Sequence, residues 1–251
     1  MPYTQESLME LGLKTGDLVL FSGDSIVSDI VEEASQSKWA HAGVIWVDLN
    51  DQGSKIQILE SVVHIFKKES QGSMIPSNIN IKSGVQINLF DEILDPQREI
   101  VTTKLFNKVA IRRLKNPLSI DQISKFATYA NKHIGIPYEK KLLPLIEAAI
   151  GPERISKILT EIKERFPKEE PKIRNLLVDP DLSSVFCSQL VVEMYEEVGI
   201  IPSSKIELFS SPGDLSSLSK LPEFKNGNIL GPEEILIKPT ERSRSRCCAI
   251  L

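Results

Sequence analysis

The sequence has few of the residues on which metal and thiol chemistry depends. Its 251 residues include three cysteines and three histidines, and none of them stands in a CxxC, HExxH or similar spacing. The spacing therefore predicts no metal site, and no cofactor is expected. Cys187 is the only cysteine in the body of the chain. It has no partner there for a disulfide, so a reducing compartment is expected.

Two further absences narrow the class of protein. The chain has 30 Lys and Arg against 34 Asp and Glu, a net charge of -4, and it lacks the basic excess that nucleic-acid binding needs. It also lacks an apolar run of the roughly 18 residues that a membrane-spanning helix requires. No GxxxxGK[ST] loop is present, which argues against a small GTPase. With 41% hydrophobic residues, we expect a soluble globular domain over residues 1–237 and a disordered tail over residues 238–251.

The last five residues, CCAIL, hold the other two cysteines. Cys248–Leu251 matches the C-a-a-X motif, in which a final Leu favours geranylgeranylation of Cys248, and Cys247 is a candidate for a second, palmitoyl chain. Four basic residues and one glutamate lie just before them. A lipid chain together with a basic segment gives stable anchoring to anionic lipids. Unless this match arose by chance, we expect a peripheral protein on the cytoplasmic face of a eukaryotic membrane, in its own or a host cell.

Hydrophobic periodicity predicts a strand-rich first half and a helix-rich second half, and hence an α+β fold. The strands are expected to form an antiparallel meander. Residues 139–180 are charged, amphipathic and interrupted by prolines, so we expect a helical insertion or lid there. The expected strands span residues 17–23, 40–49, 54–66, 83–90 and 107–114, and the expected helices span 25–35, 119–133 and 183–199.

Cys187 lies in the first turn of the predicted helix 183–199. Leu190, Val191 and Met194 follow it at helical spacing, so the cysteine belongs to the buried face. Periodicity alone favours a packing role, because free cysteine is among the most buried residue types. Its position favours a nucleophile, because a helix N-terminus stabilises a thiolate. A nucleophilic Cys187 would also need a base.

The three histidines differ as candidates for this base. His41 begins a predicted strand between small residues, which leave its ring room to meet another side chain. His64 lies at the irregular end of a predicted strand and is the main alternative to His41 as the base. His133 lies at a helix C-terminus, where a histidine usually caps carbonyl groups. Glu60 interrupts an apolar strand face and needs a partner there, either His41 on the neighbouring strand or a lysine.

Six short motifs occur in an order that resembles a known enzyme superfamily. They are TGDLVLFSG, SKWAHAGVIW, ILES, GIPYEK, FCSQLVVEMYEEVG and SPGDL. Their order is similar to that in the circularly permuted papain-like, or NlpC-type, cysteine hydrolases and acyltransferases. The nearest likeness is to the YiiX and YaeF-like bacterial group with its poxviral relatives. The likeness covers residues 15–62, 135–139 and 183–215 and leaves the insertion uncovered.

The resemblance implies a permuted papain-like fold, in which an antiparallel sheet or small barrel packs against the helix that carries the nucleophile. It implies Cys187 as nucleophile, His41 as base and Glu60 as the residue that orients the imidazole. Tyr138 and Ser188 are candidate oxyanion or substrate contacts. Members of this superfamily cleave or transfer acyl groups held in amides and esters, including peptides and lipids.

The sequence therefore predicts a membrane-anchored thiol hydrolase or acyltransferase that acts on a lipid, a lipidated protein or a peptide. Two alternatives fit the same residues. The chain could be an inactive protein that binds a lipid or peptide at the membrane. It could also be an adaptor whose tail brings residues 139–180 to a partner. Nucleic acid is not an expected partner.

Overall fold

A computed structural model describes the backbone over much of the chain and most of the side chains along it. The predicted helix 25–35 except residues 32 and 35, most of the insertion 139–180, Tyr138 and the tail 238–251 lie outside the described residues. Side chains are not described at residues 49–50, 53, 62–67 and 79–83. The described residues are 3–23, 32, 35, 37–50, 53–67, 79–95, 108–136, 153, 156–157, 160, 163–164, 187–202, 211–218, 224 and 229–237.

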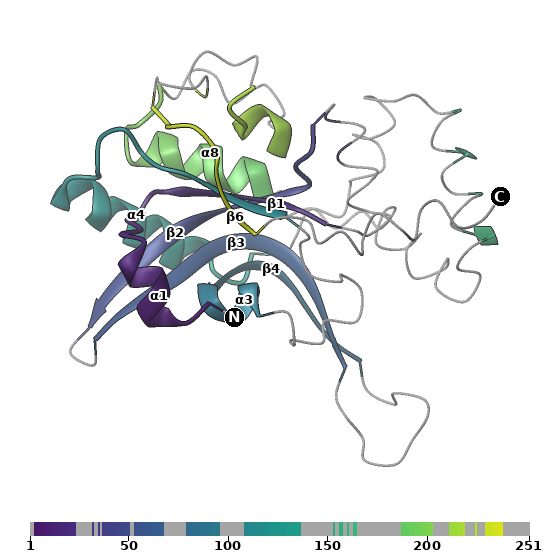
Figure 1. Ribbon diagram of the computed structural model, residues 1–251, viewed down its shortest axis with the longest axis horizontal. Helices are drawn as coiled ribbons and strands as arrows, with labels where there is room; N and C mark the ends of the chain where they lie inside the picture. The colour runs from purple at the N-terminus through teal and green to yellow at the C-terminus, as the bar shows by residue number, and fades with distance from the viewer. Residues whose placement is uncertain are drawn as a thin grey trace.

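Six antiparallel strands form one sheet in the order β4-β3-β2-β1-β5-β6 (Figure 1). The predicted meander is confirmed for β1 to β4, which pair in chain order, whereas β5 pairs with β1. All five predicted strands are present, and β6 was not predicted. The strands are β1 (Leu18–Ser22), β2 (His41–Asn50), β3 (Gly53–Lys67), β4 (Ile79–Leu89), β5 (Lys108–Arg112) and β6 (Glu234–Ile237).

Helices cover both faces of this sheet, which makes the fold α+β. Helices α8 (Cys187–Glu197) and α4 (Ile120–His133) share one apolar core with the sheet. Helices α1 (Gln5–Glu10) and α3 (Phe90–Leu94) share the other core and lie on the opposite side from α8 in Figure 1. Every residue of β1 is buried, and its four apolar side chains, Leu18 to Phe21, enter the two cores alternately. Phe90, predicted at the end of a strand, instead begins α3.

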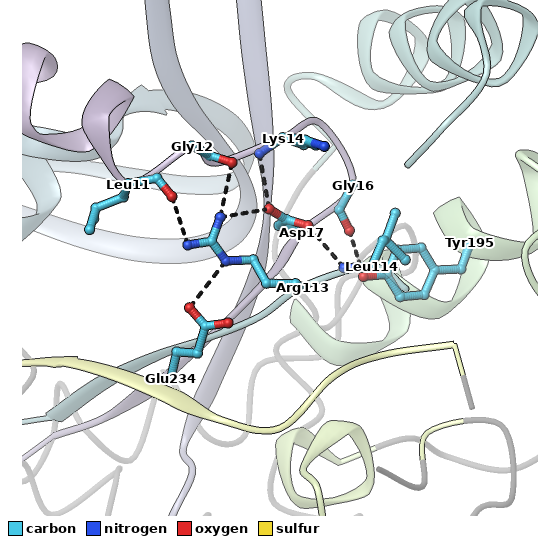
Figure 2. Close-up of polar contacts among 9 residues, drawn as sticks. All are labelled: Leu11, Gly12, Lys14, Gly16, Asp17, Arg113, Leu114, Tyr195 and Glu234. Carbon is cyan, nitrogen blue, oxygen red and sulfur yellow. Dashed lines mark hydrogen bonds and ion pairs between the residues drawn. The ribbon is translucent and has the colours of Figure 1, made fainter. Parts of the chain in front are cut away.

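A polar network at the start of β1 holds α8 against the sheet (Figure 2). The carboxylate of Asp17 is buried and accepts hydrogen bonds from the backbone N–H groups of Lys14 and Leu114, both at 2.9 Å. The hydroxyl of Tyr195, on α8, donates to the carbonyl oxygen of Gly16 at 2.8 Å. The turn before β1 therefore binds both β5's end and the helix that carries Cys187. Arg113 extends the network to Leu11, Gly12 and Glu234.

The SPGDL motif also lies beside α8. Its residues form the short 3-10 helix η2 (Pro212–Leu215), which packs against α8 and β2. The buried guanidinium of Arg112, on β5, donates to the carbonyl oxygen of Leu215 at 2.6 Å. A Cβ at Gly213 would come 2.5 Å from the Cβ of Ser37, so a glycine is needed for this close approach. The motif thus fixes the loop before β2, where His41 begins the strand.

Candidate active site

Cys187, His41 and Glu60 meet at the start of β2. His41 is the first residue of β2, Glu60 lies in β3, and Cys187 is the first described residue of α8. Their exposed fractions are 8% for His41, 0% for Glu60 and 4% for Cys187. A thiol, an imidazole and a carboxylate are therefore buried together, and each must be satisfied by its neighbours.

The register between β2 and β3 brings the imidazole to the carboxylate. Gly43 pairs directly with Glu60, so His41, two residues earlier on the same face, is the diagonal neighbour of Glu60. His41 Nε2 lies 2.8 Å from Glu60 Oε2. A Cβ at Gly43 would come 2.6 Å from Ile58 Cδ1, so the Ile58 side chain of β3 can pack over β2 at this point because residue 43 has no side chain. His41 is thus a partner of Glu60, as the sequence allowed.

The thiol of Cys187 completes the arrangement from the other side of the ring. Helix α8 packs against β2 and β3, and the Cys187 side chain hydrogen-bonds to His41. Because Glu60 occupies Nε2, Nδ1 is the ring nitrogen left for the sulfur. The backbone N–H groups of Ala42 and Ser188 also point to Cys187. The sulfur therefore has donors from both the strand and the first turn of its own helix.

These contacts favour a charged pair within the protein. Burial opposes a charge on His41, but Cys187 and Glu60 outweigh it and raise the pKa of His41 from 6.5 to about 10. Burial also opposes a thiolate, but the imidazolium of His41 and the N–H groups of Ala42 and Ser188 together lower the pKa of Cys187. Both shifts favour a thiolate beside an imidazolium over a neutral pair, and a thiolate is the nucleophilic form of cysteine.

Asn88, on β4, is a further member of this arrangement that the sequence reasoning missed. Its amide Nδ2 donates to Glu60 Oε1 at 2.8 Å. Gln86 and Asn88 alternate with the apolar Val85 and Ile87, so one face of this predicted strand is polar. That alternation was the signal that this strand could supply a polar partner for Glu60, which interrupts the apolar face of another strand. Identifying the contact required the β3–β4 register.

The remaining candidates divide into described and undescribed residues. Ser188 is 3% exposed, and its backbone N–H points to the sulfur. His133 contacts the carbonyl oxygen of Tyr129 through Nδ1 at 2.8 Å, at the end of α4 as expected. The backbone of His64 pairs with Lys82, and its side chain is not described. Tyr138, Cys247 and Cys248 lie outside the described residues.

Two properties of the described part of the chain bear on metal binding and on membrane insertion. Among the residues that the structure describes, no group of three or more His, Cys, Asp or Glu side chains is placed to hold a metal ion. No helix in the same residues is both long enough and apolar enough to cross a bilayer.

Comparison with solved structures finds a distant likeness to a bacterial protein. No protein-family model matches the chain, and no curated protein matches it in sequence. The structure is similar to the crystal structure of the metalloprotein YiiX from Escherichia coli O157:H7, with a TM-score of 0.38 and 18% sequence identity. The match covers 72% of this chain and 92% of YiiX. YiiX gives its name to the bacterial group that the motifs resemble, and a likeness this distant does not establish a shared family.

Proposed function

We propose that this chain is a cysteine-dependent hydrolase or acyltransferase with a permuted papain-like fold, and that Cys187, His41 and Glu60 are its catalytic residues. One observation supports the proposal above all: the buried thiol contacts an imidazole whose other nitrogen is held by a buried carboxylate. A nucleophile, a base and a group that orients the base are the three parts of a catalytic triad. The six motifs in superfamily order support the same assignment.

The proposed reaction proceeds through a thioacyl enzyme. The Cys187 thiolate attacks the carbonyl carbon of an amide or ester and forms a C–S bond. The C–N or C–O bond then breaks, and the imidazolium of His41 gives its proton to the leaving group. Neutral His41 next takes a proton from water or another acceptor, which attacks the thioester and releases the acyl group. The N–H groups that point to Cys187, including that of Ser188, are suited to stabilise the negative charge that develops.

The tail supplies the proposed location. Prenylation of Cys248, with a possible second chain on Cys247, would hold the enzyme at a cytoplasmic membrane face beside lipid substrates. We therefore favour lipid acyl esters, N-acyl amides and lipid-modified proteins as substrates over free peptides. This preference is based on the tail sequence alone.

Thiol reactivity tests the catalytic assignment. The full chain is titrated with a mild electrophile such as iodoacetamide between pH 5 and 9, and modification at Cys187 is followed by mass spectrometry. We expect Cys187 to react well below the pH at which a model thiol reacts, because the imidazolium maintains the thiolate. His41→Ala should abolish this advantage and leave the rate of a buried, ordinary thiol.

His133→Ala is the matched control, because it removes an imidazole that has no contact with the sulfur among the described interactions. It should leave the labelling profile of Cys187 unchanged. A wild-type profile that matches that of a model thiol would support an inactive binding protein or an adaptor instead.

A further inference from the structure

The carboxylate of Glu60 has a separate partner at each oxygen. Oε2 lies 2.8 Å from His41 Nε2, and Oε1 accepts a hydrogen bond from Asn88 Nδ2, also at 2.8 Å. The Glu60 side chain is fully buried. A buried carboxylate is stable only when donors satisfy both of its oxygens, and donors to an ionised group make the stronger hydrogen bonds.

The sheet register places these partners in one line. Asn88 pairs with Ile58, and Glu60 is two residues further along β3, so Asn88 is the diagonal neighbour of Glu60 on the same face. His41 is the diagonal neighbour of Glu60 on the other side. Three adjacent strands, β4, β3 and β2, thus supply an amide, a carboxylate and an imidazole in sequence, and the imidazole contacts Cys187.

An amide suits this position chemically. A glutamate side chain has several rotatable bonds, and holding it in one orientation costs conformational entropy. A second fixed donor restricts that freedom. The amide of Asn88 has no charge, so it can hold Glu60 without neutralising the attraction between Glu60 and the imidazolium of His41. A lysine in the same place would compete with the imidazolium for the carboxylate.

The hydrogen bond to Glu60 is specific to Asn88, as a comparison with the nearby amide of Gln86 shows. It lies directly opposite Glu60 in the register, on the same face as Asn88. Yet, in the part of the chain that the structure describes, the buried Nε2 of Gln86 has no hydrogen-bond partner. Two amides of the same chemistry therefore flank the carboxylate on one strand, and Asn88 is the one that bonds to it.

We propose that Asn88 is a positioning residue, which holds Glu60 so that Oε2 of the carboxylate stays against Nε2 of His41. This inference rests on the proposed function, because a positioned imidazole matters only if it serves Cys187. Asn88 acts through Glu60 and His41.

The titration of the His41 ring in the full, ligand-free chain tests this role, and NMR of the imidazole nitrogens measures it without a substrate. Among the described residues, the ionisable groups that act on His41 include Cys187 from α8 and Glu60 from β3. In Asn88→Leu, the pKa of His41 should fall by about one unit, a tenfold change in its dissociation constant. Glu60→Gln should lower it further, and Gln86→Leu should leave it unchanged.

A second variant, Asn88→Thr, is measured in the same way, and it replaces Asn88→Leu in the test if that variant does not fold. Threonine is well accommodated in strands, and its side chain is too short to keep the bond to Glu60. Circular dichroism establishes which variants are folded. The same fall in both Asn88 variants supports the inference.

The outcomes separate this inference from the proposed function. Suppose His41 in the wild type titrates near its ordinary value and Cys187 reacts like a model thiol; then the proposed function is wrong, and the inference is wrong with it. Suppose instead that the wild type behaves as proposed and Glu60→Gln lowers the pKa of His41. An unchanged or raised pKa in the Asn88 variants would then overturn the role of Asn88 alone.

Discussion

At the scale of single residues, Cys187 shows what helical periodicity can and cannot establish. Periodicity predicted that its side chain faces the core, and at 4% exposure it does. Periodicity also favoured a packing role, because it reports which side of a helix is buried and not which polar group lies opposite. The polar group that Cys187 meets is the imidazole of His41, which lies on strand β2. The catalytic role remains a prediction that the labelling experiment addresses.

The same pair of residues predicts how stability depends on pH. The raised pKa of His41 contributes stability that is complete below 6.5, its unfolded value, and is lost as the pH rises towards about 10. The lowered pKa of Cys187 contributes stability that is complete above 9.0, its unfolded value, and is lost as the pH falls. Between 6.5 and 9.0 the stability contributed by His41 falls as the pH rises, while that contributed by Cys187 increases, so their sum changes little. Below this interval only the Cys187 contribution is lost, and above it only the His41 contribution is lost. This pair should therefore stabilise the fold most in that interval.

Urea denaturation of the wild type and of Cys187→Ala from pH 5 to pH 10 measures this effect. The difference between the two free energies of unfolding should be greatest inside the interval and should shrink on the acid side, as the thiolate is protonated. A difference that is constant with pH would contradict the charged pair.

At the scale of secondary-structure elements, five of the six strands and the helices α4 and α8 could be predicted from the sequence, whereas α1, α3 and β6 were not. The predicted strands and helix α4 have clear hydrophobic patterns, and Ser119 caps the start of α4. Helices α1 and α3 and strand β6 have four to six residues each. A helix of five or six residues is too short for helical periodicity to be measured, and β6 has only four residues, so tertiary contacts determine these three segments.

The close approach of β2 to β3 leads to a prediction about Gly43. An alanine there would place its Cβ 2.6 Å from Ile58 Cδ1 and 3.1 Å from the carbonyl oxygen of Leu59. Overpacking of this kind should lower the free energy of unfolding by about 1–3 kcal/mol. It should also separate Glu60 from His41, and so slow the labelling of Cys187.

Gly231→Ala is the control for Gly43→Ala. Its added Cβ would lie 3.6 Å from the nearest backbone atom, which is an ordinary contact. Thermal or urea denaturation should show little change in this variant. Equal losses of stability in the two variants would mean that the approach of β2 to β3 is not the cause.

At the scale of the whole molecule, the sheet brings together residues that lie far apart in the chain. Strand β2 follows a loop that η2 holds in place, and α8 is held by the network around Asp17 (Figure 2). Each of these attachments involves a segment distant in sequence from the residue it positions. The candidate site therefore depends on the complete fold. The proposed partner of the whole protein is a membrane.

Removal of the lipid attachment tests the proposed location. In eukaryotic cells, Cys248→Ser should shift the protein from the membrane to the soluble fraction, because the basic segment alone adds only about 1 kcal/mol for each positive charge. Cys247→Ser is the paired variant, which should weaken membrane binding but leave prenylation intact. Cell fractionation and mass spectrometry of the tail measure both. Unchanged membrane association of Cys248→Ser would rule out this anchor.

The sequence by itself determined the α+β class, the main strands, the burial of Cys187 and the need of Glu60 for a polar partner. Each of these follows from local periodicity or from the cost of burying a charge. Only the tertiary structure decided that His41 is that partner, that Cys187 meets the same imidazole, and that Asn88 holds the second oxygen of Glu60. Strand register and helix packing decide these contacts, and neither can be read from a single segment of the chain.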